Sequence, residues 1–122
     1  MDKNDLLKID RALGRLGDFS KHSRGTTGAI QKMRQDVLFT DGLFSSKVKT
    51  LAAALWAVSA RCEPCITFYI AKAKEYGATE AEVGEVMSIA STMGGCVGEM
   101  WALKAYNAFK EDSHSEGTSC CR

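Results

Sequence analysis

The sequence predicts an all-α protein of about six helices joined by short connections. Three observations support this prediction. The 122 residues contain one proline, which leaves long uninterrupted stretches for helices. Apolar residues recur three or four positions apart, as on one helix face, and no stretch shows the sustained alternation of a half-buried strand. The length suits a single domain, predicted over residues 1–112 and followed by a flexible, cysteine-containing tail over 113–122.

The first helix is predicted over residues 1–16, where apolar residues form one stripe of Leu6, Ile9, Leu13 and Leu16. Residues 17–28 are polar and contain glycines, so we expect a connection there. A second helix should follow and should end before the turn signal at residues 40–42. Its apolar face consists of Ile30, Met33 and Val37.

A third helix is expected after Ser45 and Ser46, which are suitable N-caps. Its predicted inner face consists of Val48, Leu51, Ala52, Leu55, Trp56 and Ser59. The fourth helix should begin around Cys62–Pro64, because the missing N–H of a proline needs no partner in the first helical turn. Its apolar stripe consists of Ile66, Tyr69, Ile70, Ala73 and Tyr76, and Gly77 should end it.

A capping box formed by Thr79 and Glu82 predicts the start of a fifth helix. Its inner face should consist of Val83, Val86, Met87, Ala90 and Met93. The pair Gly94-Gly95 is expected to break this helix, and a sixth should run from about Cys96 to Lys110. Several large side chains at helical spacing are expected in the core or in an interface, namely Trp56, Met87, Met93, Met100 and Trp101.

The charge of the chain is nearly balanced, with 16 Lys and Arg residues against 15 Asp and Glu residues. This balance gives no basic field for nucleic acid, so no nucleic-acid partner is expected. No apolar run reaches the length of about 18 residues that would indicate a membrane span. The N-terminus also lacks the apolar segment of a signal peptide. We therefore expect a cytoplasmic protein with no membrane partner.

Five cysteines cannot all pair within one chain, but Cys62 and Cys65 lie three residues apart around the only proline. That spacing places both sulfurs on one side of a first helical turn, where they can close a disulfide. The partial positive charge and free N–H groups of a helix N-terminus stabilise a thiolate, which is the reactive form. The pair therefore predicts a thiol–disulfide cycle in which one thiolate attacks and the other resolves. Which cysteine attacks is open.

A zinc site is a competing interpretation, because a Cys-x-x-Cys pair is also half of such a site. The other candidate ligands form no second knuckle; they are Cys96, His114, Cys120 and Cys121. A pair without chemistry is a further alternative. A thioredoxin-like domain would place the pair after a hydrophobic strand, whereas here it follows the helical pattern of residues 51–58. We predict a redox site on an all-α scaffold, without a metal or cofactor.

Four motifs then occur in a set order around an alanine-rich helix: KVKTL at 47–51, CEPCI at 62–66, YGATEAE at 76–82 and IASTMGG at 89–95. The combination resembles the carboxymuconolactone decarboxylase and alkylhydroperoxidase D-like family over roughly residues 40–112. The resemblance implies an all-α fold that forms homo-oligomers, commonly trimers or hexamers. The decarboxylase branch normally lacks Cys-x-x-Cys. The branch that carries it implies peroxiredoxin-type activity on a peroxide or disulfide substrate, with an electron-donor protein or thiol.

The sequence departs from the redox branch at its proton relay. That branch usually has a glutamate twelve positions before the first cysteine and a histidine four after the second, and these positions are Thr50 and Tyr69 here. Threonine is not a carboxylate base, and tyrosine has an ordinary pKa of about 10. A helical Tyr69 would point back over Cys65 and could donate a hydrogen bond to a thiolate or a substrate. A core aromatic is the alternative interpretation.

Other residues are accessory candidates. Glu63 is a candidate proton acceptor, although a carboxylate in a first helical turn also suits the helix dipole without any catalytic role. Cys96 is either a third redox thiol or a small hydrophobe in the core. The adjacent Cys120 and Cys121 could pass electrons, bind a soft metal or have no role. Two other functions stay open for the chain: a decarboxylase-like small-molecule enzyme with structural cysteines, and a non-enzymatic metal- or ligand-binding module.

Overall fold

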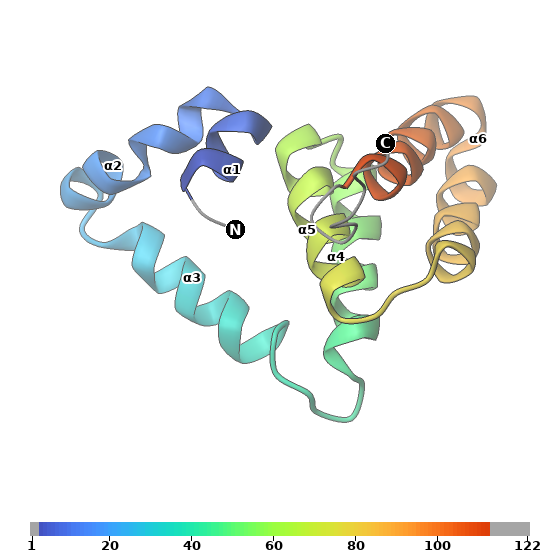
Figure 1. The fold of residues 1–122 in the computed structure, drawn as a ribbon, viewed down its shortest axis with the longest axis horizontal. Helices are drawn as coiled ribbons and strands as arrows, with labels where there is room; N and C mark the ends of the chain where they lie inside the picture. Colours follow the sequence, from blue (N-terminus) through green and yellow to red (C-terminus); the bar gives the residue numbers. More distant parts are fainter. Residues whose placement is uncertain (1–2, 113–122) are drawn as a thin grey trace, which may run out of the picture. The chain divides into compact units, whose positions relative to one another are not determined.

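The computed structural model describes residues 3–112, and helices account for most of that range (Figure 1). In order they are α1 (Lys3–Ile9), the 3-10 helix η1 (Arg11–Arg15), α2 (Leu16–His22), α3 (Thr26–Val37), α4 (Ser46–Ser59), α5 (Glu63–Glu75) and α6 (Glu80–Glu111). The all-α prediction is confirmed. The chain forms two compact units that divide between Asp41 and Gly42. A single domain over 1–112 stays a prediction, and the tail over 113–122 lies outside the described residues.

Within residues 3–112, no helix has the length and hydropathy that crossing a membrane requires.

The first unit shows that the predicted helix over 1–16 and the predicted connection over 17–28 are wrong. The first helix stops at Asp10, whose backbone is extended and whose carboxylate accepts a hydrogen bond from the Ala12 N–H at 2.9 Å, so the chain restarts as η1. Helix α2 fills most of the predicted connection. The turn is confined to residues 23–25, where Arg24 and Gly25 have left-handed φ angles of 62° and 79°. Of the three glycines in residues 17–28, only Gly25 therefore marks a turn. Gly17 lies inside α2 and Gly28 inside α3.

The second unit packs α4, α5 and α6 against one another around a shared apolar core (Figure 1). Its fully buried side chains are aliphatic or small, which lets the helices approach closely. The core consists of Leu51, Ala54, Ala57, Val58, Ile66, Ile70, Ala73, Ala78, Val83, Met87, Ala90, Ala102, Ala105 and Phe109. The stripes predicted for α5 and for the first half of α6 supply much of this core.

The inner face predicted for α4 is largely wrong. Val48, Trp56 and Ser59 are exposed, and Trp56 is 68% accessible. Of the predicted stripe only Leu51 is buried. The other buried residues of α4 lie outside that stripe, at Ser46, Thr50, Ala54, Ala57 and Val58. Because α4 carries small or apolar residues on nearly every side, their spacing cannot identify the face that turns inward. Met87 is in the core as expected, whereas Met93 and Met100 are exposed.

The ends of the helices agree closely with the sequence prediction. The Ser45 side chain caps α4 by accepting a hydrogen bond from the Val48 N–H at 3.2 Å. Gly77, with φ 96°, ends α5. Thr79 and Glu82 form both hydrogen bonds of the predicted capping box at the start of α6. The Lys47 ammonium lies 2.9 Å from Glu82 and, through this hydrogen bond, lowers the pKa of that carboxyl below its ordinary value.

Removing the Thr79 hydroxyl should weaken the start of α6. We expect Thr79→Ala to lower the free energy of unfolding by about 1 kcal/mol, because the Glu82 N–H loses its acceptor. Thr92→Ala is the matched control, since the exposed Thr92 hydroxyl only donates back to the Ser88 carbonyl within the helix. Urea unfolding monitored by circular dichroism measures both variants. Equal stabilities would show that the capping box contributes nothing.

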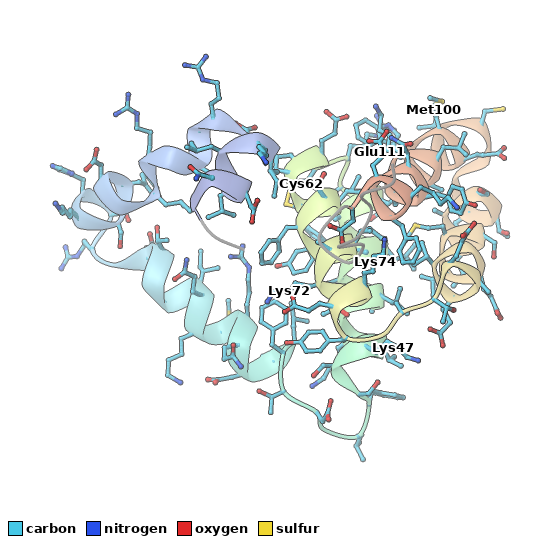
Figure 2. The ribbon with its side chains drawn as sticks, in the orientation of Figure 1. Lys47, Cys62, Lys72, Lys74, Met100 and Glu111 are labelled. Carbon is cyan, nitrogen blue, oxygen red and sulfur yellow. A yellow bond between two sulfur atoms is a disulfide. The ribbon has the colours of Figure 1, made fainter. Side chains whose placement is uncertain are left out.

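Helix α6 changes direction at Gly95, whose φ of 62° and ψ of −142° are not helical. The predicted break is therefore confirmed, although the helical segments on both sides of Gly95 are together named α6. The second half returns along the unit and is held at its end. There, Lys74 donates to the Phe109 carbonyl at 2.9 Å and lies over the Phe109 ring (Figure 2). Glu80 accepts hydrogen bonds from the Tyr106 hydroxyl and the Lys110 ammonium, and both bonds lower the pKa of the Glu80 carboxyl. The bond between Tyr106 and Glu80 also raises the pKa of the Tyr106 hydroxyl.

Candidate active site at the start of helix α5

The sulfur pair lies where α4 ends and α5 begins, at a tightly bonded turn. The Arg61 N–H donates to the Val58 carbonyl, and the Cys62 N–H donates to the Ala57 carbonyl, both at 3.1 Å. These two bonds form a Schellman motif, which requires a left-handed residue at its centre. Arg61 takes that position with φ 58°, although glycine is the usual residue there. The turn therefore holds the Cys62 backbone against the end of α4.

Cys62 and Cys65 form a disulfide at the N-terminal end of α5, with their Cα atoms 5.3 Å apart (Figure 2). Cys62 is the N-cap residue, and Pro64 lies in the first turn as predicted. Both cysteines are half-buried, and Cys65 packs against the core. A reduced pair in this position would have its thiolates next to the positive end of the helix dipole. The arrangement can therefore open and close a disulfide.

The two residues at the relay positions have different environments. Thr50 is fully buried, and its hydroxyl donates to the Ser46 and Lys47 carbonyls at 2.8 and 3.0 Å. The hydroxyl proton of Thr50 is thus engaged in hydrogen bonds within α4, and no described interaction joins Thr50 to either cysteine. Tyr69 lies one turn after Cys65 on the same side of α5 and packs partly against the core. Its ring meets the Phe68 ring edge to face at 5.1 Å.

Glu63 is directed toward α6 and forms an ion pair there. Its carboxylate lies 3.1 Å from the Lys104 ammonium, which also lies 5.2 Å from the centre of the Trp101 ring. Both members of the pair are partly exposed, so the pair contributes little to stability. It does tie the first turn of α5 to the second half of α6. No sequence pattern pointed to Lys104, because the two residues are 41 positions apart.

Cys96 lies apart from the disulfide. It follows the Gly95 kink, is exposed and has a free thiol. The interpretation of Cys96 as a small core hydrophobe is therefore wrong. Within residues 3–112 no described interaction connects it to Cys62 or Cys65, and no three His, Cys, Asp or Glu side chains cluster as metal ligands would. Cys120, Cys121 and His114 lie outside the described residues.

A groove of about 760 Å³ lies between α4 and α6, next to the turn that carries the disulfide. Its walls are mostly apolar and include both tryptophans of the chain, Trp56 and Trp101. Arg61 is the one charged side chain among the lining residues. The sequence pattern did not predict this groove, because Trp56 and Met93 were expected on the inner faces of their helices and both are exposed.

The comparisons with known proteins agree with this architecture. The model of the carboxymuconolactone decarboxylase family matches residues 25–108. The chain belongs to the carboxymuconolactone decarboxylase family. Its relatives include an uncharacterized protein of Cupriavidus necator, 32% identical over 107 residues that cover 88% of this chain and 91% of that protein. The crystal structure of an apo carboxymuconolactone decarboxylase family protein from Legionella pneumophila is similar to it, with a TM-score of 0.78 and 28% identity. That match covers 89% of this chain and 97% of the other.

This carboxymuconolactone decarboxylase family protein thus combines a disulfide at a helix N-terminus with an altered set of neighbours. Thr50 is engaged inside its own helix, and Glu63 is paired with Lys104. Tyr69 is the remaining polar side chain at a relay position. Its hydroxyl makes no hydrogen bond within residues 3–112, which leaves it available to a thiolate or a bound molecule.

Proposed function

We propose that the protein is a thiol–disulfide oxidoreductase that reduces peroxides with the Cys62–Cys65 pair. The observation that carries this proposal is the disulfide itself, formed between the N-cap and the first turn of α5. Membership of the family is consistent with it. The proposal includes a reducing cytoplasmic setting, a small peroxide or disulfide substrate, and assembly into a homo-oligomer of trimeric or hexameric size.

The cycle has three balanced steps. A cysteine thiolate attacks the terminal oxygen of a hydroperoxide, so an S–O bond forms, the O–O bond breaks, and the alkoxide leaves and takes up a proton. The second thiolate then attacks the resulting sulfenic acid, which forms the disulfide and releases water once a proton is added. A dithiol donor finally returns two electrons and two protons to the pair and itself becomes a disulfide.

Thiol counting in the full chain tests this proposal. The background variant carries Cys96→Ser, Cys120→Ser and Cys121→Ser, so only Cys62 and Cys65 can react. We expect one equivalent of hydrogen peroxide to remove both free thiols of the reduced protein, and mass spectrometry to find a Cys62–Cys65 disulfide. Stable thiols after peroxide treatment would refute the redox function.

Tyr69 is proposed to donate its hydroxyl proton in a hydrogen bond to the attacking thiolate or the leaving oxygen. We expect Tyr69→Phe to slow the reaction with peroxide about tenfold, the equivalent of one charge-assisted hydrogen bond. Stopped-flow loss of thiols measures the rate. Tyr76→Phe, a half-buried tyrosine at the far end of α5, is the control and should react at the original rate. Equal rates for both variants would make Tyr69 a packing residue.

A further inference from the structure

The groove between α4 and α6 has walls of the kind that line small-molecule sites. They are formed by α4 residues before the turn and by α6 residues on both sides of the Gly95 kink. Trp56 and Met93 in these walls are 68% and 82% exposed, so water covers apolar surface that a ligand would remove from it. The volume of about 760 Å³ falls in the range of about 300–1,000 Å³ that is usual for small-molecule pockets.

The charge in the groove selects for an anion. Arg61 contributes the one guanidinium among the lining side chains, and no carboxylate faces it from either wall. Among the residues that the structure describes, Arg61 has no ion-pair partner. A guanidinium presents several N–H donors in a plane that matches a carboxylate.

The side chain of Arg61 is not needed to cap α4. Three carbonyls in the last turn of that helix already accept hydrogen bonds, at Trp56 from the Ala60 N–H and the Ser59 hydroxyl, and at Ala57 and Val58 through the Schellman turn. The guanidinium therefore has its donors free at the edge of an apolar groove.

We propose that this groove binds an organic carboxylate with an apolar body, whose carboxylate pairs with Arg61 and whose alkyl or aryl part lies between Trp56, Trp101 and Met93. The next residue after Arg61 is Cys62, so the acid group would lie beside the turn that carries the disulfide. The binding needs no electron transfer, so it can hold or fail independently of the proposed redox function.

Intrinsic fluorescence tests this site directly, because both tryptophans of the chain line the groove. The probes are octanoate, 1-octanol and octylammonium, which share one chain and differ in charge. They are titrated into the full chain carrying Cys62→Ser and Cys65→Ser, so redox chemistry plays no part. We expect octanoate to shift the emission to shorter wavelength with saturation, and to bind about tenfold more tightly than 1-octanol. Octylammonium should bind most weakly.

Variants at Arg61 assign the preference to its charge. Arg61→Gln should remove the advantage of octanoate over 1-octanol, and Arg61→Lys should retain most of it. Arg24→Gln is the matched control, because Arg24 is also exposed, also has a left-handed backbone and lies outside the groove. Equal binding of octanoate and 1-octanol would overturn the proposal, as would an unchanged preference in Arg61→Gln. An emission that depends on protein concentration and ignores octanoate would also overturn it, since a second copy would then cover the groove.

Discussion

Gly98→Ala is expected to lower the melting temperature of the protein by about 10 °C, through a loss of about 3 kcal/mol in the free energy of unfolding. Gly98 lies in the first turn after the Gly95 kink, where α6 passes close to its own first half. A Cβ atom at Gly98 would overlap the Ala90 carbonyl oxygen and lie 3.0 Å from the carbonyl carbon. Both are backbone atoms and cannot rotate away, so the two halves of α6 would have to separate.

The same substitution elsewhere in α6 provides the control. Gly84 lies in the first half of the helix, and a Cβ atom there would have no neighbour within 4 Å. Gly84→Ala should therefore raise the free energy of unfolding by about 0.5–1 kcal/mol, because alanine has the higher helix propensity. Thermal unfolding followed by circular dichroism compares the two variants. If Gly98→Ala melts at the original temperature, α6 does not make this close approach.

Serine at either Cys62 or Cys65 should reduce peroxide turnover at least about 100-fold, because a cycle needs one thiolate to attack and the other to resolve. The two variants should differ in their first turnover. The variant that retains the attacking cysteine should consume one equivalent of peroxide and accumulate a sulfenic acid, which dimedone traps. The other variant should consume none when both are made in the background that lacks Cys96, Cys120 and Cys121. The pair of measurements assigns the attacking sulfur, which neither the spacing nor the geometry decides.

Cys96→Ser is the control for these variants, since its exposed thiol has no described interaction with the pair, and it should turn over at the original rate. Full turnover in the double variant Cys62→Ser/Cys65→Ser would exclude the disulfide cycle. Conversion of a lactone or carboxylate substrate by that double variant would instead favour a decarboxylase-like enzyme with structural cysteines.

Features that depend on a few neighbouring residues could be predicted from the sequence. The Ser45 cap, the Thr79 capping box and the start of α5 at Cys62 each depend on contacts within about one helical turn, and the structure has all three. Asp10 is a local signal of the same kind, but it lies inside an apolar stripe that favours a continuous helix. The predicted connection over residues 17–28 was wrong because glycines inside helices were taken as signs of a loop.

Features that depend on tertiary packing could not be predicted in the same way. The face of α4 that turns inward is decided by α5 and α6, which bury Thr50 and leave Trp56 outside. The pairing of Glu63 with Lys104 also requires the fold, since α6 must return past the start of α5. The cysteine pair was identifiable because both sulfurs lie within one turn. The groove and the position of Arg61 at its edge also depend on how the helices pack.

The hydrogen bond from the Cys62 N–H to the Ala57 carbonyl limits how the backbone can respond if the disulfide opens in the proposed cycle. Because this amide caps the end of α4, opening the disulfide cannot unwind the start of α5 without also breaking the hydrogen bond that ends α4. We therefore expect the oxidised and reduced proteins to share one backbone and to differ only in the rotamers of the two sulfurs. An electron donor of the proposed cycle would then have to recognise the half-buried sulfurs themselves, since the surface around them would keep the same shape in both states.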